Sequence, residues 1–85
     1  MQECDVTGTQ LRAARGALGW PVSELAKRSK VGTATIVRYE TSQGVPASRK
    51  QNLQKLKSAL EAAGIEFIGT PTDRPGIRIG MPKQG

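Results

Sequence analysis

Histidine is absent from this chain of 85 residues, and Cys4 is its single cysteine. Zinc sites built from Cys and His are therefore excluded, and neither a Ser-His triad nor a Cys-His dyad can form. A lone cysteine cannot close an internal disulfide, and a redox-sensor role for Cys4 stays open beside an incidental thiol. We expect no metal, no cofactor and no catalytic residue.

Long apolar runs and aromatic residues are also scarce. No stretch approaches the roughly 20 apolar residues that span a bilayer, and the polar, acidic start MQECDVTGTQ is unlike a signal peptide. These absences predict a cytoplasmic protein without a membrane segment. Phe, Trp and Tyr occur once each, so the core of a single domain has to come from aliphatic side chains.

Acidic residues are few as well, since 13 Lys and Arg face 7 Asp and Glu and leave a net charge of +6. A basic balance favours polyanionic partners, with nucleic acid first among them. A basic surface that serves only solubility is the alternative. The scattered acidic residues form no paired-carboxylate motif, and no glycine loop suited to phosphate is present, so an enzyme is the least expected class.

Four segments have apolar residues at helical spacing. They cover about 9–18, a stretch that begins at Pro21 and ends at a break over 30–32, then 33–41, and finally 48–63. Gly19 and Gly64 follow the first and last segments as helix-ending glycines. Ser48, with a Gln three residues later, predicts a capping box at the start of the last helix.

Beyond residue 64 the apolar period changes from 3.6 to 2. Residues 65–68 and 77–79 are predicted to form two short strands of a hairpin, joined by the turn-forming stretch GTPTDRPG. The predicted organisation is a flexible N-terminus over 1–8, a helical domain over 9–64, a β-hairpin over 65–80 and a disordered tail over 81–85.

The second and third segments, two short helices with a tight break between them, are typical of a helix-turn-helix. In that motif the second helix of the pair enters the major groove. With Ile36 and Tyr39 directed inward, the outward side chains become the expected base contacts, with an Arg for guanine and small apolar groups for thymine methyls. These residues are Thr33, Ala34, Val37 and Arg38. The alternative is that the small residues pack against a partner protein.

Phosphate contacts are expected around this helix and at the start of the fourth, where backbone amides favour anions. The candidates are Arg12, Lys30, Thr41, Ser42, Gln43, Ser48, Arg49 and Lys50.

The segments LRAARGALGW and SELAKRSKVGTATIVRYE, in this order and spacing, resemble the phage-repressor-type (Xre-like) helix-turn-helix family. The resemblance covers about 9–63. It implies a mainly α fold, a four-helix lambda-repressor-like domain whose third helix reads DNA, here followed by a C-terminal β-hairpin. It also implies an ion pair between Arg15 and Glu40 and a phosphate contact for Arg12.

Three departures from the family pattern stand out. Pro21 and Val22 occupy the positions where members often have Ser or Thr followed by a phosphate-binding Gln. Lys30 replaces the glycine of the turn, with Gly32 two residues on. Many members end in a fifth helix, whereas this chain predicts a hairpin.

The hairpin is expected to form a dimer interface, because a helix-turn-helix monomer contacts only a few base pairs and two copies are needed on neighbouring half-sites. The predicted interface residues are Ile65, Phe67, Ile68, Ile77 and Ile79. The rival is that the hairpin folds back on the fourth helix and buries Phe67 against Leu56 or Leu60. On the opposite face Glu66 and Arg78 are predicted to pair across the strands.

Together these patterns predict a sequence-specific DNA-binding transcriptional regulator. It would act as a homodimeric repressor or controller, including of its own gene, on paired half-sites of double-stranded DNA. Three alternatives remain: an antitoxin-type regulator whose hairpin also binds a toxin protein, a regulator that contacts RNA polymerase, and a protein-interaction module without DNA binding.

Overall fold

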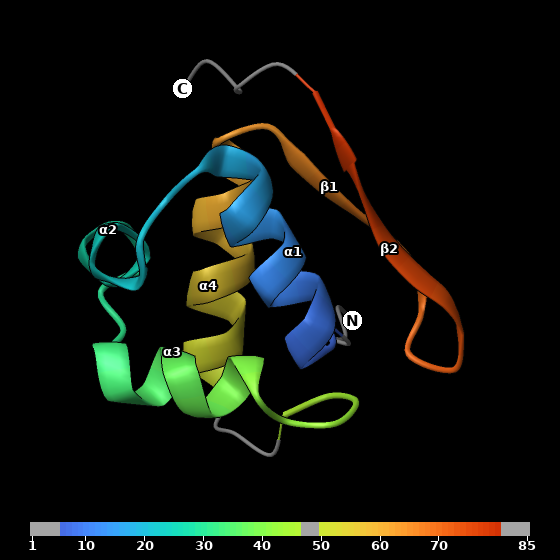
Figure 1. Cartoon of the computed structure of the whole chain (residues 1–85), viewed down its shortest axis with the longest axis horizontal. Helices are drawn as coiled ribbons and strands as arrows, with labels where there is room; N and C mark the ends of the chain where they lie inside the picture. The colour runs from blue at the N-terminus through green and yellow to red at the C-terminus, as the bar shows by residue number, and fades with distance from the viewer. Residues whose placement is uncertain (1–5, 47–49, 81–85) are drawn as a thin grey trace.

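The computed structural model describes residues 6–46 and 50–80 (Figure 1). Its elements are α1 (Gly8–Leu18), α2 (Val22–Ser29), α3 (Thr33–Glu40), α4 (Lys50–Ala62), β1 (Ile65–Thr70) and β2 (Asp73–Ile79). In Figure 1, α3 crosses one end of the domain, α2 lies on one flank, and the hairpin covers the other flank beside α1. The predicted order of four helices followed by a hairpin is confirmed.

The helix ends follow from local chemistry. The Thr7 hydroxyl accepts a hydrogen bond from the Gln10 backbone while the Gln10 side chain accepts one from the Thr7 backbone, a complete capping box for α1. Gly19 ends α1 in the left-handed conformation at φ 68°, as its position predicts. The predicted capping residue of α4, Ser48, lies outside the described residues, as do 1–5 and 81–85.

Residues 6–8 correct the predicted flexible N-terminus, because they belong to the folded domain. The Val6 side chain is only 2% exposed and packs into the core. Gly8 touches the end of α3 so closely that an added Cβ would lie 2.3 Å from the Tyr39 carbonyl oxygen. This segment is therefore part of the folded domain: the Val6 side chain packs in the core, and the Thr7 hydroxyl caps α1.

One hydrophobic core serves all four helices and the hairpin. Its fully buried aliphatic side chains come from every helix, with Tyr39 as the single buried aromatic residue. The buried set is Val6, Leu11, Ala14, Leu25, Val31, Ile36, Tyr39, Leu53, Leu56, Leu60 and Ile65. The β-branched segment 33–41 is helical because that conformation places Ile36 and Tyr39 together in this core.

The hairpin is longer than its apolar pattern predicts. Ile65 pairs with Ile79 and Phe67 with Ile77. After an irregularity between Ile68 and Thr70, pairing continues to Thr70 and Asp73, which flank a turn of two residues. Gly69 makes this irregularity possible, since it has φ 77° and an added Cβ would lie 2.2 Å from the Arg74 carbonyl oxygen. The stretch predicted as a long turn is thus mostly strand.

The inner face of the hairpin packs on the domain's own helices. Ile65 is 2% exposed, and Phe67 and Ile77 pack against the core. The assignment of Ile65 as a dimer contact is therefore wrong, because its side chain is buried in the chain's own core. Phe67 and Ile77 are partly buried against the same core, so only part of each side chain is left for a second subunit. The apolar face of a two-stranded sheet needs cover to be stable in water, and the helices of the same chain supply it. The hairpin is thus part of the domain rather than a separate unit.

Gln10 fastens the hairpin to the start of α1. Its Nε2 donates hydrogen bonds to the Ile68 carbonyl at 3.1 Å and to the Gly76 carbonyl at 2.8 Å. Its Oε1 accepts from the Thr7 backbone at 2.9 Å. A buried amide with all three bonds made ties the N-terminal cap to both strands.

Replacing Gln10 is expected to destabilise the whole domain. Gln10→Ala should lower the free energy of unfolding by about 2–4 kcal/mol, because it removes part of the capping box and the hydrogen bonds to two partly buried carbonyls. Gln10→Glu keeps the capping acceptor but has no amide to donate, so it should also destabilise the domain. Denaturant titrations measure both, and Gln54→Ala, at an exposed glutamine of α4, is the matched control. Equal unfolding midpoints for Gln10→Ala and Gln54→Ala would contradict this role.

Candidate nucleic-acid interface

The α2–α3 pair is joined by a connection of three residues, 30–32, as the sequence predicts. Lys30 ends α2 in the left-handed conformation at φ 66°, and its backbone N–H donates to the Ala26 carbonyl at 2.9 Å. A lysine thus takes the backbone conformation for which the family uses glycine, at a conformational cost on the order of 1 kcal/mol. The sharp turn between the two helices is kept.

The α3 helix buries one face and exposes the other. Ile36 and Tyr39 are almost fully buried, whereas the Val37 side chain is 49% exposed. All four residues predicted to contact bases are exposed on this helix: Thr33, Ala34, Val37 and Arg38. The outward face therefore combines two small apolar side chains, a hydroxyl and a guanidinium.

The Arg38 guanidinium lies 5.6 Å from the centre of the Tyr39 ring, within the range of a cation–π contact. None of the ion pairs between described residues involves Arg38. Its N–H donors are thus available for an acceptor brought to the helix, while the neighbouring ring limits the freedom of its stem.

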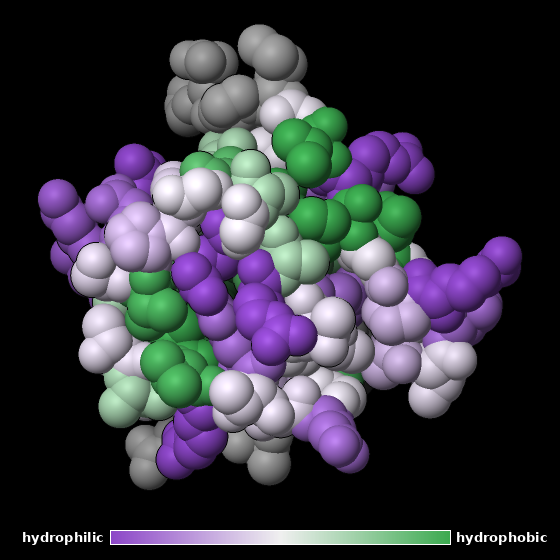
Figure 2. All heavy atoms as spheres, viewed as in Figure 1, coloured by the Kyte–Doolittle hydropathy of each residue, from purple (hydrophilic) through white to green (hydrophobic). Residues whose placement is uncertain are grey.

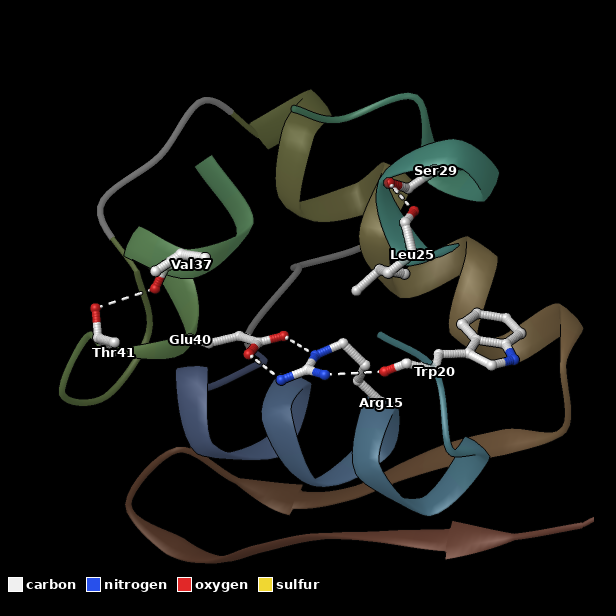
Figure 3. A network of polar contacts seen from close by, with 7 residues as sticks. All are labelled: Arg15, Trp20, Leu25, Ser29, Val37, Glu40 and Thr41. Carbon is white, nitrogen blue, oxygen red and sulfur yellow. Dashed lines mark hydrogen bonds and ion pairs between the residues drawn. The ribbon is translucent and has the colours of Figure 1, made fainter. Parts of the chain in front are cut away.

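Arg15 and Glu40 form the predicted ion pair, which connects α1 to the end of α3 (Figure 3). Arg15 Nε donates to Glu40 Oε2 at 2.8 Å and Nη2 donates to Oε1 at 2.9 Å. Nη1 donates to the Trp20 backbone carbonyl at 2.9 Å. The hydrogen bonds to the Glu40 carboxylate raise the pKa of the Arg15 guanidinium above its ordinary value.

The location of this pair sets the position of α3. The Glu40 side chain is 5% exposed and that of Arg15 is 20% exposed, so the pair is mostly shielded from water. A bidentate contact fixes orientation as well as distance. One guanidinium therefore holds α3 and the α1–α2 connection in one arrangement, a link that the sequence could not reveal because the Trp20 acceptor is a backbone carbonyl.

The predicted phosphate contacts fall into three groups. Arg12, Lys30 and Gln43 are exposed, as the prediction requires. Thr41 and Ser42 instead use their hydroxyls to donate to carbonyls of α3, Thr41 to Val37 and Arg38 at 3.1 Å and Ser42 to Arg38 at 3.0 Å.

A DNA phosphate only accepts hydrogen bonds, so each of these two hydroxyls would have to break its bonds to the α3 carbonyls before it could donate to one. Ser48, Arg49 and the side chain of Lys50 lie outside the described residues.

The start of α2 also differs from the family pattern, as its sequence indicates. Pro21 is the N-terminal cap and makes no side-chain capping hydrogen bond. Val22, at the position of the family's phosphate-binding Gln, packs against the core. The chain thus uses this position for packing.

Two further properties of the described residues bear on function. None of the described helices is long and apolar enough to cross a membrane. Within 6–46 and 50–80 no three side chains of the Cys, Asp and Glu types are grouped so that they could hold a metal ion.

Comparisons with known proteins add no further assignment. The chain matches no protein-family model, and a search of curated proteins finds no significant relative. The residues and geometry described above are therefore the basis for any functional conclusion.

A double-mutant cycle tests whether Arg15 and Glu40 act as a unit. Arg15→Ala leaves the more deeply buried Glu40 carboxylate without a partner and is expected to lower the free energy of unfolding by about 3–5 kcal/mol. Glu40→Ala alone should be more damaging than the double substitution, since a lone shielded charge is the unfavourable state. Denaturant titration of the four proteins measures the coupling, expected at about 1–3 kcal/mol. Additive losses would show that the two side chains are independent.

Proposed function

We propose that this protein is a sequence-specific DNA-binding regulator of transcription that inserts α3 into the major groove as the second helix of a helix-turn-helix. The observation that supports this most directly is the exposed face of α3. Ala34 and Val37 are exposed beside an Arg38 that has no acidic partner among the described residues. A helix face meant only for solvent gains nothing from an exposed valine.

The chemistry of this face matches base edges. An arginine donates two parallel hydrogen bonds to guanine O6 and N7, and small apolar side chains contact the thymine methyl group. Thr33, at the first turn of α3, has a hydroxyl suited to a base edge or a phosphate. The bidentate Arg15–Glu40 pair holds the helix rigidly, so the cost of ordering it on DNA is small.

The net charge of +6 supplies the attraction that does not depend on sequence. Arg12 and Lys30 are exposed cations on α1 and at the α2–α3 turn and are the proposed phosphate contacts in the described region. Lys30 is of special interest because it occupies a backbone conformation that glycine adopts at lower cost. An ammonium useful on DNA is a reason to retain a lysine there.

Dimerisation through the hairpin is part of the proposal. The hairpin lies on the flank beside α1, which leaves α3 free at the end of the domain (Figure 1). The domain measures 29 × 26 × 25 Å, so two copies side by side suit half-sites about 34 Å apart.

The apolar surface available for this contact is smaller than the sequence predicts. Ile79 is 65% exposed at the end of β2, and hydrophobic side chains gather over the strands in Figure 2. Ile68 is half-buried. The Glu66–Arg78 pair, predicted across the strands, is present at 3.7 Å and adds charges of both signs to the outer face.

Readout by Arg38 is tested on DNA selected from a randomised double-stranded pool. Arg38→Ala should weaken binding to the selected site by roughly 1–3 kcal/mol and relax the preference at one base pair. Arg12→Ala or Lys30→Ala should weaken all sequences alike and lower the slope of log K against log salt by about one. Fluorescence anisotropy measures each affinity, and Arg74→Ala, an equal charge change at the hairpin turn, is the control.

Failure to select any sequence would refute the proposed function. Selection followed by full discrimination in Arg38→Ala would instead refute the proposed orientation of α3.

The dimer is tested in the full chain, because removal of the hairpin would expose the core. Ile79→Glu should convert a dimer into a monomer in sedimentation velocity, since it places a charge in the proposed contact, while the thermal midpoint changes little at so exposed a site. Val45→Glu, at an exposed apolar residue outside the hairpin, is the control and should remain dimeric. A dimer that persists in Ile79→Glu would exclude this interface.

A further inference from the structure

A hollow of about 530 Å³ opens between the ends of α1 and α4, the α1–α2 connection and the last turn of α2. The C-terminal ends of α1 and α4 lie at the end of the domain away from α3 (Figure 1). The walls of the hollow are Leu18, Trp20, Arg28, Ala59, Ala62 and Ala63. Pockets for small molecules have volumes of roughly 300–1,000 Å³ and mostly apolar walls with a few polar groups. This hollow has that volume and wall chemistry, but it is an open depression rather than an enclosed cavity.

The composition of the walls explains the hollow. Ala59 and Ala62 of α4, with Ala63 directly after the helix, border the hollow, and side chains of this size leave space beside the end of α4. Trp20, the only tryptophan of the chain, is half-buried and packs against the core beside that space. The hollow is therefore lined by one aromatic side chain and by small aliphatic groups.

Arg28 supplies the polar group. Its guanidinium lies 4.5 Å from the centre of the Trp20 ring, and its Nε donates to Glu24 at 2.6 Å. Within 6–46 and 50–80 its two terminal nitrogens donate no hydrogen bond, and the side chain is 53% exposed. A guanidinium at the edge of an apolar pocket selects a carboxylate, which it binds through parallel N–H donors.

We propose that this hollow is a binding site for a small molecule with an apolar body, about the size of an aromatic ring, and a carboxylate group. The apolar body packs against Trp20 and the three alanines that line the hollow. The carboxylate accepts hydrogen bonds from the free end of Arg28, in competition with Glu24.

The site is connected to α3 through a single side chain. The Trp20 carbonyl accepts from Arg15 Nη1, and the same guanidinium holds Glu40 at the end of α3 (Figure 3). A ligand that moves the Trp20 segment therefore acts on the residue that positions α3. The existence of the site does not depend on the proposed DNA binding.

Phenylacetate is the probe, and phenylacetamide is its neutral counterpart of nearly equal shape. The fluorescence of Trp20 reports binding without a label, since no other tryptophan is present. Phenylacetate should change the fluorescence saturably with a dissociation constant on the order of 1 mM, as expected for a ligand of about ten heavy atoms. Phenylacetamide should bind roughly tenfold more weakly, because it lacks the charge that Arg28 recognises.

Three variants of α2 make the assignment specific. Arg28→Gln should abolish the preference for phenylacetate, whereas Glu24→Gln should strengthen its binding several-fold by releasing Arg28. Lys27→Gln changes the charge equally on an exposed neighbour and should leave binding as it is in the original chain. In NMR titrations the Arg15 Nε–H signal should move together with that of the Trp20 indole.

The proposal is overturned if phenylacetate causes no saturable change. It is also overturned if acid and amide bind equally, or if Lys27→Gln weakens binding as much as Arg28→Gln.

Discussion

The ion pair between Arg15 and Glu40 is the interaction on which the arrangement of this domain depends. It joins the first helix to the end of the third with two hydrogen bonds, and the remaining nitrogen of the same guanidinium fixes the α1–α2 connection at Trp20. A shielded ion pair adds little net stability compared with apolar residues of equal size, but it penalises any arrangement that separates the charges. Its main effect is therefore to specify one orientation of α3.

The orientation of α3 determines where its exposed side chains are presented. Exposed Ala34, Val37 and Arg38 on a mobile helix would be an ordinary surface, whereas on a fixed helix they are a pattern of one cation and two apolar groups. Two residues whose conformation or exposure is unfavourable for stability, Lys30 and Val37, lie on the exposed face of α3 or next to it in the sequence. Lys30 holds a left-handed backbone conformation at φ 66° and Val37 is exposed to water, and the proposed contact with DNA would account for both.

The N-terminal segment and the hairpin together cover one flank of the helical core. A bundle of four short helices leaves one flank of its core open, and a two-stranded sheet cannot be stable alone. Val6, Ile65 and the partly buried Phe67 close the core from that side. Gln10 donates hydrogen bonds to carbonyls of both strands, and these bonds fix the position of the hairpin relative to α1.

Much of this molecule follows from local sequence. Apolar spacing predicts the four helices, glycine predicts the ends of α1 and α4, and period-two alternation predicts the strands, because each signal is a property of a few neighbouring residues. The outward face of α3 follows in the same way once Ile36 and Tyr39 are assigned inward. The Arg15–Glu40 pair was implied by the family resemblance, and its geometry agrees with that implication.

Other features depend on residues far apart in the chain. The apolar pattern of the hairpin suits a second subunit as well as its own helices, and only the structure shows that Ile65 packs in the chain's own core while Ile79 stays exposed. In the sequence Gln10 is only a capping residue of the first helix. Its hydrogen bonds to the carbonyls of Ile68 and Gly76 form only in the tertiary structure. The hollow at Trp20 arises only where α1, α2 and α4 meet. Sequence by itself determined which surfaces are apolar or charged, and tertiary structure decided which of them meet, because that choice depends on the shape of the whole core.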